Sequence, residues 1–348
     1  MRNVLPYYLG YLTPLSVVVG YALGGAWTFQ TLFWVYAIIP VIDVLVGRER
    51  RSRPEHEALA RSRALAYRWP LWLYAPLQGG LLVWALWTVA NRPLSALELT
   101  GLTISLGVAN GAIGITVAHE LMHRRGAFER VLAEALMTSV SYTHFIIEHV
   151  HGHHRGVAIP GDPATARLGE GFYAFLPRCV AGSLASAWRL ERGRLARRGQ
   201  PCASPRNRML RYAAIQAVLY GVVALAFGAV GVAVFLAQAA VAAILLEVTN
   251  YIEHYGLERR ALGDGRFEPV SARHSWDSNQ RITNWFLFEL ARHADHHLNP
   301  GRRYPALRSN AESPKLPAGY AATFMLALVP PLWRRVMDPR VAAWRATP

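Results

Sequence analysis

Residues 97–123 read LELTGLTISLGVANGAIGITVAHELMH, a largely apolar run that passes directly into two histidines four positions apart. The run over 97–118 is long enough to cross a bilayer as a helix, which needs about 20 apolar residues. On a helix, His119 and His123 share one face and can bind one metal ion. The stretch therefore predicts a transmembrane helix that presents metal ligands at one face of the membrane.

The composition extends this prediction to the whole chain. Of 348 residues, 53% are hydrophobic and only 17% are charged, and the apolar residues gather in long runs. Six runs have the length of a membrane span, which predicts an all-α, polytopic membrane protein with one domain over residues 1–348. The first run is not expected to be a cleavable signal, because no small-residue cleavage site follows it. The predicted spans lie near residues 5–26, 28–46, 70–90, 97–118, 210–229 and 231–253.

Arginine indicates which side of the membrane is cytoplasmic. The segment between the second and third spans is rich in arginine, whereas the turns on the opposite side carry little beyond Arg92. By the positive-inside rule that segment is cytoplasmic, and both termini are then cytoplasmic as well. Residues 119–208 and 254–348 are predicted to form a cytoplasmic helical cap. The net charge of +15 fits this bias and attraction to anionic lipid. Nucleic-acid binding is not expected, because no binding motif accompanies the arginines.

Nine of the 13 histidines are expected to meet at this cytoplasmic face as metal ligands. Neutral imidazole suits iron, zinc or copper, and nine ligands would fill two ions at about four or five each. The sequence therefore predicts a dinuclear centre. His149 and His153 would share one face of a helix, and the cluster around His296 would share another. The nine are His119, His123, His149, His153, His154, His254, His293, His296 and His297.

Several neighbours of these histidines are expected to orient them. Metal-bound imidazoles usually donate their second N–H group to a carboxylate, although solvated charge is the alternative role for these acidic residues. His144 and His274 lie near the clusters and are candidates for further donors or replacement ligands. His151 would face away from its neighbours on an α-helix, and His56 is expected to be solvated. The four carboxylates are Glu120, Glu148, Glu253 and Asp295.

The chain lacks the residues for an electron relay of its own. Cys179 and Cys202 are too few for an iron–sulfur site, and no GxGxxG follows a predicted strand. A redox reaction would therefore need electrons from a separate protein. Arginines beside the histidine motifs are expected to form the surface on which that protein docks. The alternative is that they bind lipid phosphate or brace the last histidine cluster. They are Arg124, Arg125, Arg155, Arg302 and Arg303.

The motif at 119–123 also permits a hydrolytic interpretation. HExxH is the zinc-protease signature, in which two histidines bind zinc and the glutamate acts as the base. Such a zinc site needs only one further protein ligand. It would leave the other histidine clusters unexplained, so the protease remains a minor alternative.

Four sequence elements together resemble those of the bacterial membrane alkane 1-monooxygenases, the non-haem di-iron hydroxylases of the AlkB type. The similarity extends over roughly residues 110–340, and the HYG element separates this family from fatty-acid desaturases. It implies six membrane helices, two iron ions held by the nine histidines, and O₂-dependent hydroxylation of a terminal methyl group. It also implies electrons from rubredoxin, which an NADH-dependent reductase reduces. The elements are HELMH at 119–123, HFIIEHVHGHHR at 144–155, NYIEHYGL at 250–257 and LARHADHHLNPGRRYPALR at 290–308.

The substrate is the least determined feature. Medium- or long-chain n-alkanes are expected, but the related xylene monooxygenases share HELMHR, so a methyl-aromatic substrate stays open, as does desaturation. An alkane offers no hydrogen bond, so the enzyme must select it by cavity shape. Ordinary helix packing is the competing role for the glycines among the candidate lining residues. Those candidates are Trp27, Phe33, Trp34, Gly107, Gly111 and Gly114.

Overall fold

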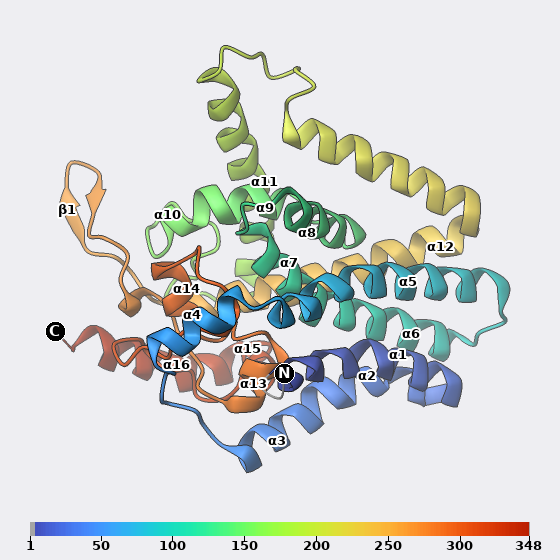
Figure 1. Cartoon of the computed structure of the whole chain (residues 1–348), viewed down its shortest axis with the longest axis horizontal. Coiled ribbons are helices and arrows are strands. Elements are labelled where there is room, and N and C mark those ends of the chain that lie inside the picture. Colours follow the sequence, from blue (N-terminus) through green and yellow to red (C-terminus); the bar gives the residue numbers. More distant parts are fainter. Residues whose placement is uncertain (1–3, 348) are drawn as a thin grey trace.

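The structure, a computed structural model, describes residues 4–347 and is almost entirely helical (Figure 1). The predicted all-α class is confirmed. Long apolar helices run side by side, and the shorter helices that carry most of the histidines lie toward their left ends in Figure 1.

The N-terminal region is a succession of short helical pieces. Gly24 has φ of +73°, a left-handed conformation that suits glycine, and it separates α1 from η2. The predicted span 5–26 therefore ends early, at Leu23, whereas the predicted span 28–46 lies within the continuous helical run Gly25–Val46. The pieces are η1 (Leu5–Tyr11), α1 (Leu12–Leu23), η2 (Gly25–Phe29), α2 (Gln30–Phe33), η3 (Trp34–Ile38) and α3 (Ile39–Val46).

The predicted third and fourth spans both form long helices. α5 (Trp69–Asn91) matches the run predicted over 70–90. α6 begins at a capping box, in which the Ser95 hydroxyl accepts the N–H of Glu98 and the Glu98 carboxylate accepts the N–H of Ser95. α6 (Ala96–Ala109), the π-helix η5 (Asn110–Gly114) and α7 (Ile115–Met122) then follow without interruption. One helical run thus carries the chain from the capping box to the first histidines.

The fifth and sixth predicted spans belong to α12 (Arg208–His254), which is bent back on itself. Gly228 lies outside helical geometry, with φ of +66° and ψ of −166°, two residues before the predicted boundary between the fifth and sixth spans. Figure 1 shows the two halves of α12 running in opposite directions from its right-hand end. Within residues 4–347, four runs are long and apolar enough to cross a membrane, so the chain is a multi-pass membrane protein. The count of six spans stays a prediction. The four runs are Gly25–Val46, Leu65–Asn91, Ala96–Met122 and Arg208–His254.

The remaining elements are short, apart from α11 and α16. One of them, the hairpin of β1 and β2, is not helical and was not predicted, although its Asp264-Gly265 turn is a hairpin signal and both residues have positive φ. The helices are α4 (Glu55–Arg63), η4 (Leu65–Tyr67), α8 (Ala127–Ser139), α9 (His144–Glu148), η6 (His149–His153), α10 (His154–Gly156), α11 (Phe172–Ala196), η7 (Ala272–His274), α13 (Arg281–Phe286), α14 (His293–Leu298), η8 (Tyr304–Ala306), α15 (Tyr320–Ala327) and α16 (Pro330–Arg345). The strands are β1 (Ala261–Gly263) and β2 (Arg266–Phe267).

Close packing of the helical run 96–122 against α12 fixes the level at which the histidines lie. A Cβ atom on Gly111 would lie 2.8 Å from the Cα of Ala242, so glycine is needed for this approach. The buried Asn110 amide also donates to the Gln238 side chain across the same interface, at 2.9 Å. These contacts hold α7 and the last turn of α12 at the same height.

Candidate metal centre

The nine histidines converge from four parts of the chain. α7 supplies His119, His123 caps the end of α7, and the last turn of α12 supplies His254. The continuous helix formed by α9, η6 and α10 supplies three, and α14 supplies the last three. Seven of the nine are buried, whereas His123 and His154 are partly exposed. The sequence predicted this convergence, and the structure brings all nine together.

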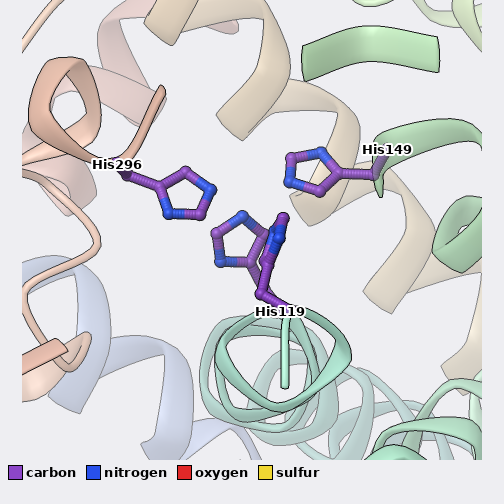
Figure 2. Close-up of side chains that lie close together, drawn as sticks. His119, His149 and His296 are labelled. Carbon is purple, nitrogen blue, oxygen red and sulfur yellow. The ribbon is translucent and has the colours of Figure 1, made fainter. Parts of the chain in front are cut away.

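Four of these histidines form one set of potential ligands, which we call group one. In Figure 2, His119, His149 and His296 point toward one another from three different elements. One nitrogen of each member lies within 4.8 Å of one nitrogen of every other member. The members are His119, His123, His149 and His296.

A second set, group two, lies beside it, and its members obey the same 4.8 Å criterion. The Nε2 atom of His254 lies 3.2 Å from those of His153 and His293, and the Nε2 atoms of His293 and His297 are 2.9 Å apart. His154 adjoins group one, because its Nε2 atom lies 3.1 Å from those of His149 and His296. The members of group two are His153, His254, His293 and His297.

The division between the groups corrects the predicted pairing of His149 with His153. Residues 149–153 form the π-helix η6, in which hydrogen bonds run from residue i to i+5. His149 therefore meets His154, five positions on, while His153 turns to His254 in the other group. The α14 histidines divide in the same way, since His296 belongs to group one and its two neighbours belong to group two.

Glycine at position 152 permits this irregular turn. A Cβ atom there would lie 2.6 Å from Oε1 of Glu148, the buried carboxylate that precedes the cluster. Glycine at this position therefore leaves room for the buried Glu148 carboxylate.

The inward nitrogens of both groups are arranged for cations. Burial lowers the pKa of His149 and His296 well below its usual value, and neighbouring imidazoles lower it further, so these rings are neutral. The buried Nε2 atoms of His119 and His123 have no hydrogen-bond partner among the described residues. Lone pairs that converge in this way repel one another unless a cation lies between them. The donor set therefore fits metal ions that prefer imidazole, such as iron, zinc or copper.

Two groups outside the histidine sets hold the outer nitrogens of group two. The Nδ1 atom of His153 lies 2.9 Å from Oδ2 of Asp162, and both side chains are buried. Although burial opposes it, the Asp162 carboxylate raises the pKa of His153. The Nδ1 atom of His254 lies 3.1 Å from the backbone carbonyl of His274, which can only accept a hydrogen bond. The sequence does not predict the contact with Asp162, because Asp162 lies nine residues after His153, in the loop that follows α10, and no helical repeat brings the two together.

Two of the four carboxylates expected to orient histidines pair with arginines instead. Glu120 lies 3.1 Å from Arg124 and accepts the backbone N–H of Tyr304 at 3.3 Å. Asp295 binds Arg302 through both oxygens, at 2.7 Å each. Tyr304 and Arg302 both lie in the segment that follows α14, so the two carboxylates help to anchor that segment.

The other two carboxylates lie closer to the histidines. Burial, followed by the nearby Asp162 carboxylate, raises the pKa of Glu148, which interacts electrostatically with His153 and hydrogen-bonds Ser186. Glu253 places Oε2 3.2 Å from Nε2 of His293. That nitrogen is the one that faces the other members of group two.

The three remaining histidines near the clusters lie outside both groups. His144 packs on the Tyr142 ring at a centroid distance of 4.3 Å, and its buried Nε2 atom has no partner among the described residues. The His274 side chain contacts Glu268 at 3.1 Å, so it serves His254 through its backbone only. His151 lies 3.5 Å from Arg208 and belongs to neither group.

An apolar cavity reaches the histidines. Its lining comes from η3, α3, η5, α7, α12, α13 and α15, and it includes His119, His149 and His293. Of the lining residues suggested by the sequence, Gly111 is confirmed. Trp27 and Phe33 are instead about 60% exposed on the outer surface. The other three candidates contact neighbouring helices: Trp34 bonds Thr13, and added Cβ atoms on Gly107 and Gly114 would strike Val241 and Gln78.

A cationic depression of about 640 Å³ also reaches the histidines. Its lining includes His123 and His154, the two partly exposed members of the nine. Five arginines line the depression, whereas its acidic lining residue is Glu134. The arginines are Arg124, Arg125, Arg130, Arg208 and Arg211.

Three arginines predicted to form a docking surface have internal partners. Arg124 is 6% exposed and donates to the carbonyls of Gly301 and Arg302 at 2.8 and 3.1 Å. Arg302 binds Asp295, and Arg303 binds Glu129 through two contacts of 2.9 Å. These residues brace the segment after α14, which was the alternative role considered for them.

The chain is similar to a family of desaturases and to several monooxygenases. The fatty acid desaturase family model matches residues 93–327. Alkane 1-monooxygenase 2 of Pseudomonas aeruginosa is 41% identical, over 98% of this chain and 92% of its own length. The alkane 1-monooxygenase of Ectopseudomonas oleovorans is 40% identical, over 90% of this chain and 78% of its own. The xylene/toluene monooxygenase hydroxylase component XylM of Pseudomonas putida is 28% identical, over 98% and 90%.

Proposed function

We propose that this chain, which belongs to the alkane 1-monooxygenase family, hydroxylates the terminal methyl group of medium- to long-chain n-alkanes. In the net reaction, O₂, an electron pair and two protons convert R–CH₃ into R–CH₂OH and water. Relatives with this activity in their names are about 40% identical over most of the chain, whereas the xylene/toluene relative is more distant.

The observation that carries this proposal is the contact between the apolar cavity and the histidine groups. The cavity wall includes His119 and His149 of group one and His293 of group two. A hydrocarbon chain in this cavity would have its end held against both groups, and the apolar walls would exclude water. Selection by shape discriminates by roughly 1–3 kcal/mol per methylene group.

We assign iron to the two groups. Breaking an unactivated C–H bond requires O₂ reduced at a redox-active centre, and two bound iron ions would supply that chemistry. Zinc-dependent proteolysis is less well supported, because its base would be Glu120. That carboxylate is paired with Arg124 and accepts a backbone N–H from Tyr304.

We further propose rubredoxin, reduced by an NADH-dependent reductase, as the electron donor. Within the described residues, the buried Cys179 and the exposed Cys202 are the two cysteines, so the chain has no iron–sulfur site of its own. The cationic depression is the better docking candidate than the predicted arginine surface. Its exposed rim residues Arg125, Arg130 and Arg211 surround the partly exposed His123. An acidic donor would be attracted there electrostatically.

We place the histidine groups and both termini on the cytoplasmic side of the bacterial inner membrane. The arginine-rich segment between α3 and α5 supports this orientation, because positive residues favour the cytoplasmic side. The other end of α5 leads into a turn that carries little charge beyond Arg92. A reporter that is active only in the periplasm, fused after residue 348, should be silent. Strong reporter activity would reverse the orientation.

The deciding experiment is turnover by the purified protein in lipid nanodiscs. NADH, rubredoxin reductase and rubredoxin would be supplied with separate n-alkanes, alkylbenzenes and fatty acids, under ¹⁸O₂. We expect labelled 1-alkanols and two iron ions per chain. Faster conversion of alkylbenzenes would favour the methyl-aromatic alternative, and unlabelled alkenyl products would favour a desaturase. A protein that contains only zinc and cleaves peptides would contradict the proposal.

A further inference from the structure

Glu253 directs a carboxylate oxygen into group two. It precedes His254 in the last turn of α12 and is 2% exposed. Its Oε2 atom lies 3.2 Å from the Nε2 atom of His293. The same nitrogen lies 3.2 Å from Nε2 of His254 and 2.9 Å from Nε2 of His297. The oxygen therefore reaches the point where the nitrogens of this group converge.

This contact differs from that of a carboxylate that merely orients a ligand. An orienting carboxylate accepts a hydrogen bond from the outer nitrogen of an imidazole, as Asp162 does from Nδ1 of His153. The outer Nδ1 atom of His293 has no hydrogen-bond partner among the described residues. Glu253 instead approaches the inner nitrogen, where a ligand of the same ion would lie.

The charge of Glu253 also lacks a counter-ion within the described residues. Its Oε1 atom accepts a hydrogen bond from the buried Tyr320 hydroxyl at 2.7 Å, and its one ion-pair contact is with His293. Glu120, by contrast, is paired with Arg124. A buried carboxylate with neutral partners is costly unless a cation is nearby. A metal ion in group two would be that cation.

We propose that Glu253 is itself a ligand, through Oε2, of the metal ion held by group two. This inference depends on the metal centre proposed above. Group one has four histidines with His154 adjoining it, and Glu253 would give group two a fifth donor as well. Iron accepts imidazole and carboxylate ligands together. Glu253 also lines the apolar cavity, together with His293.

The test measures metal binding rather than turnover. Metal-free full-length protein in nanodiscs would be titrated with Co²⁺, whose visible absorption strengthens when five-coordination falls to four. Wild-type protein is compared with Glu253→Gln, which nearly keeps the shape, and with Glu253→Ala. Glu247→Gln is the matched control, since Glu247 is a fully buried carboxylate of the same helix bonded to Tyr142.

We expect wild type and Glu247→Gln to bind two ions with the same affinities. Both Glu253 variants should bind one ion normally and the other about tenfold or more weakly, a loss at least as large as that from removing an orienting partner. Glu253→Ala should also show the stronger absorption of a four-coordinate ion. Unchanged affinities and spectrum in both variants would overturn this ligand alone. Failure of wild type to bind a second ion would overturn the dinuclear centre, and this ligand with it.

Discussion

Asp162 holds His153 from outside the histidine groups, with Oδ2 2.9 Å from Nδ1 and both side chains 1% exposed. The same Oδ2 atom accepts the Thr165 hydroxyl at 2.6 Å, and Oδ1 accepts the backbone N–H of Ala164 at 3.3 Å. The carboxylate is thus fixed by its own loop before it contacts the imidazole. A carboxylate held in this way sets the direction of the inward Nε2 atom.

Replacing this carboxylate should weaken metal binding without removing a ligand. We expect Asp162→Asn to reduce the affinity of one ion by about 10- to 100-fold, the usual effect of losing such a partner. Competition against a chelator of known affinity would measure it. Asp264→Asn, in the exposed β-hairpin turn, is the control and should leave both affinities unchanged.

Removing one histidine should empty one group and spare the other. His296→Ala should cost about one metal ion per chain, because its nitrogen belongs to group one. His56→Ala, at an exposed position of α4, should retain both ions. Metal content by mass spectrometry gives the answer, and full turnover by protein with less than one iron per chain would refute a dinuclear mechanism.

Charge reversal at the depression should impair delivery of electrons. The variant Arg125→Glu/Arg130→Glu/Arg211→Glu should have a several-fold higher KM for rubredoxin, with unchanged metal content, and the difference should shrink at high salt. Arg92→Glu is the control, a single reversal at the far end of α5, where Arg92 contacts the Trp87 ring. Steady-state rates against rubredoxin concentration decide the matter. An equal KM in both variants would remove the depression as the docking site.

Filling the apolar cavity should shift the preferred chain length. Ala321→Phe adds volume to the α15 wall, so we expect turnover to favour shorter alkanes, with roughly 1–3 kcal/mol of discrimination per methylene group displaced. Ala90→Phe, on the exposed side of α5, should leave the preference unchanged. The measurement is kcat/KM over an alkane series. A parallel loss for every chain length would indicate simple destabilisation.

The junction of α11 and α12 should be sensitive to acid. Although burial raises the pKa of Glu191, hydrogen bonds from Arg194 and Arg208 lower it to about 2, from an ordinary value of 4.5. A lowered carboxyl pKa stabilises the fold above the unfolded value and loses this effect as pH falls toward the folded value. At about 1.4 kcal/mol per pKa unit, the contribution at neutral pH is at most about 3.5 kcal/mol. Glu191→Gln should therefore lower the Tm at pH 7, and the difference from wild type should shrink between pH 4.5 and about 2. A pH-independent difference would contradict this origin.

The sequence predicted those parts of the fold that depend on composition alone. The apolar runs located α5, the helical run 96–122 and both halves of α12, and the boundary between those halves fell beside Gly228. Burial of apolar surface and bilayer length do not depend on the partner of each residue. The hairpin at Ala261–Phe267 was missed because it is too short for a periodic pattern.

Partners were harder to predict than positions. The sequence identified nine histidines that meet, but it paired His149 with His153, because an α-helical repeat was assumed where the chain forms a π-helix. It also left Arg302 and Arg303 free for a docking surface, although their acidic partners lie on α14 and α8. Such pairings depend on three-dimensional proximity, which residue spacing does not encode.

The π-helix η6 means that the spacing of two ligands has to be read together with the type of helix between them. Five residues of a π-helix turn the chain by nearly the same angle as four residues of an α-helix, which is why His154 meets His149. If the same sequence formed an ordinary α-helical turn here, His154 would rotate by roughly 100° away from His149. A homologue that lacks one residue between His149 and His153 would form an α-helical turn and still direct its histidines to the same two groups. An alignment gap at this point is therefore compatible with an intact centre.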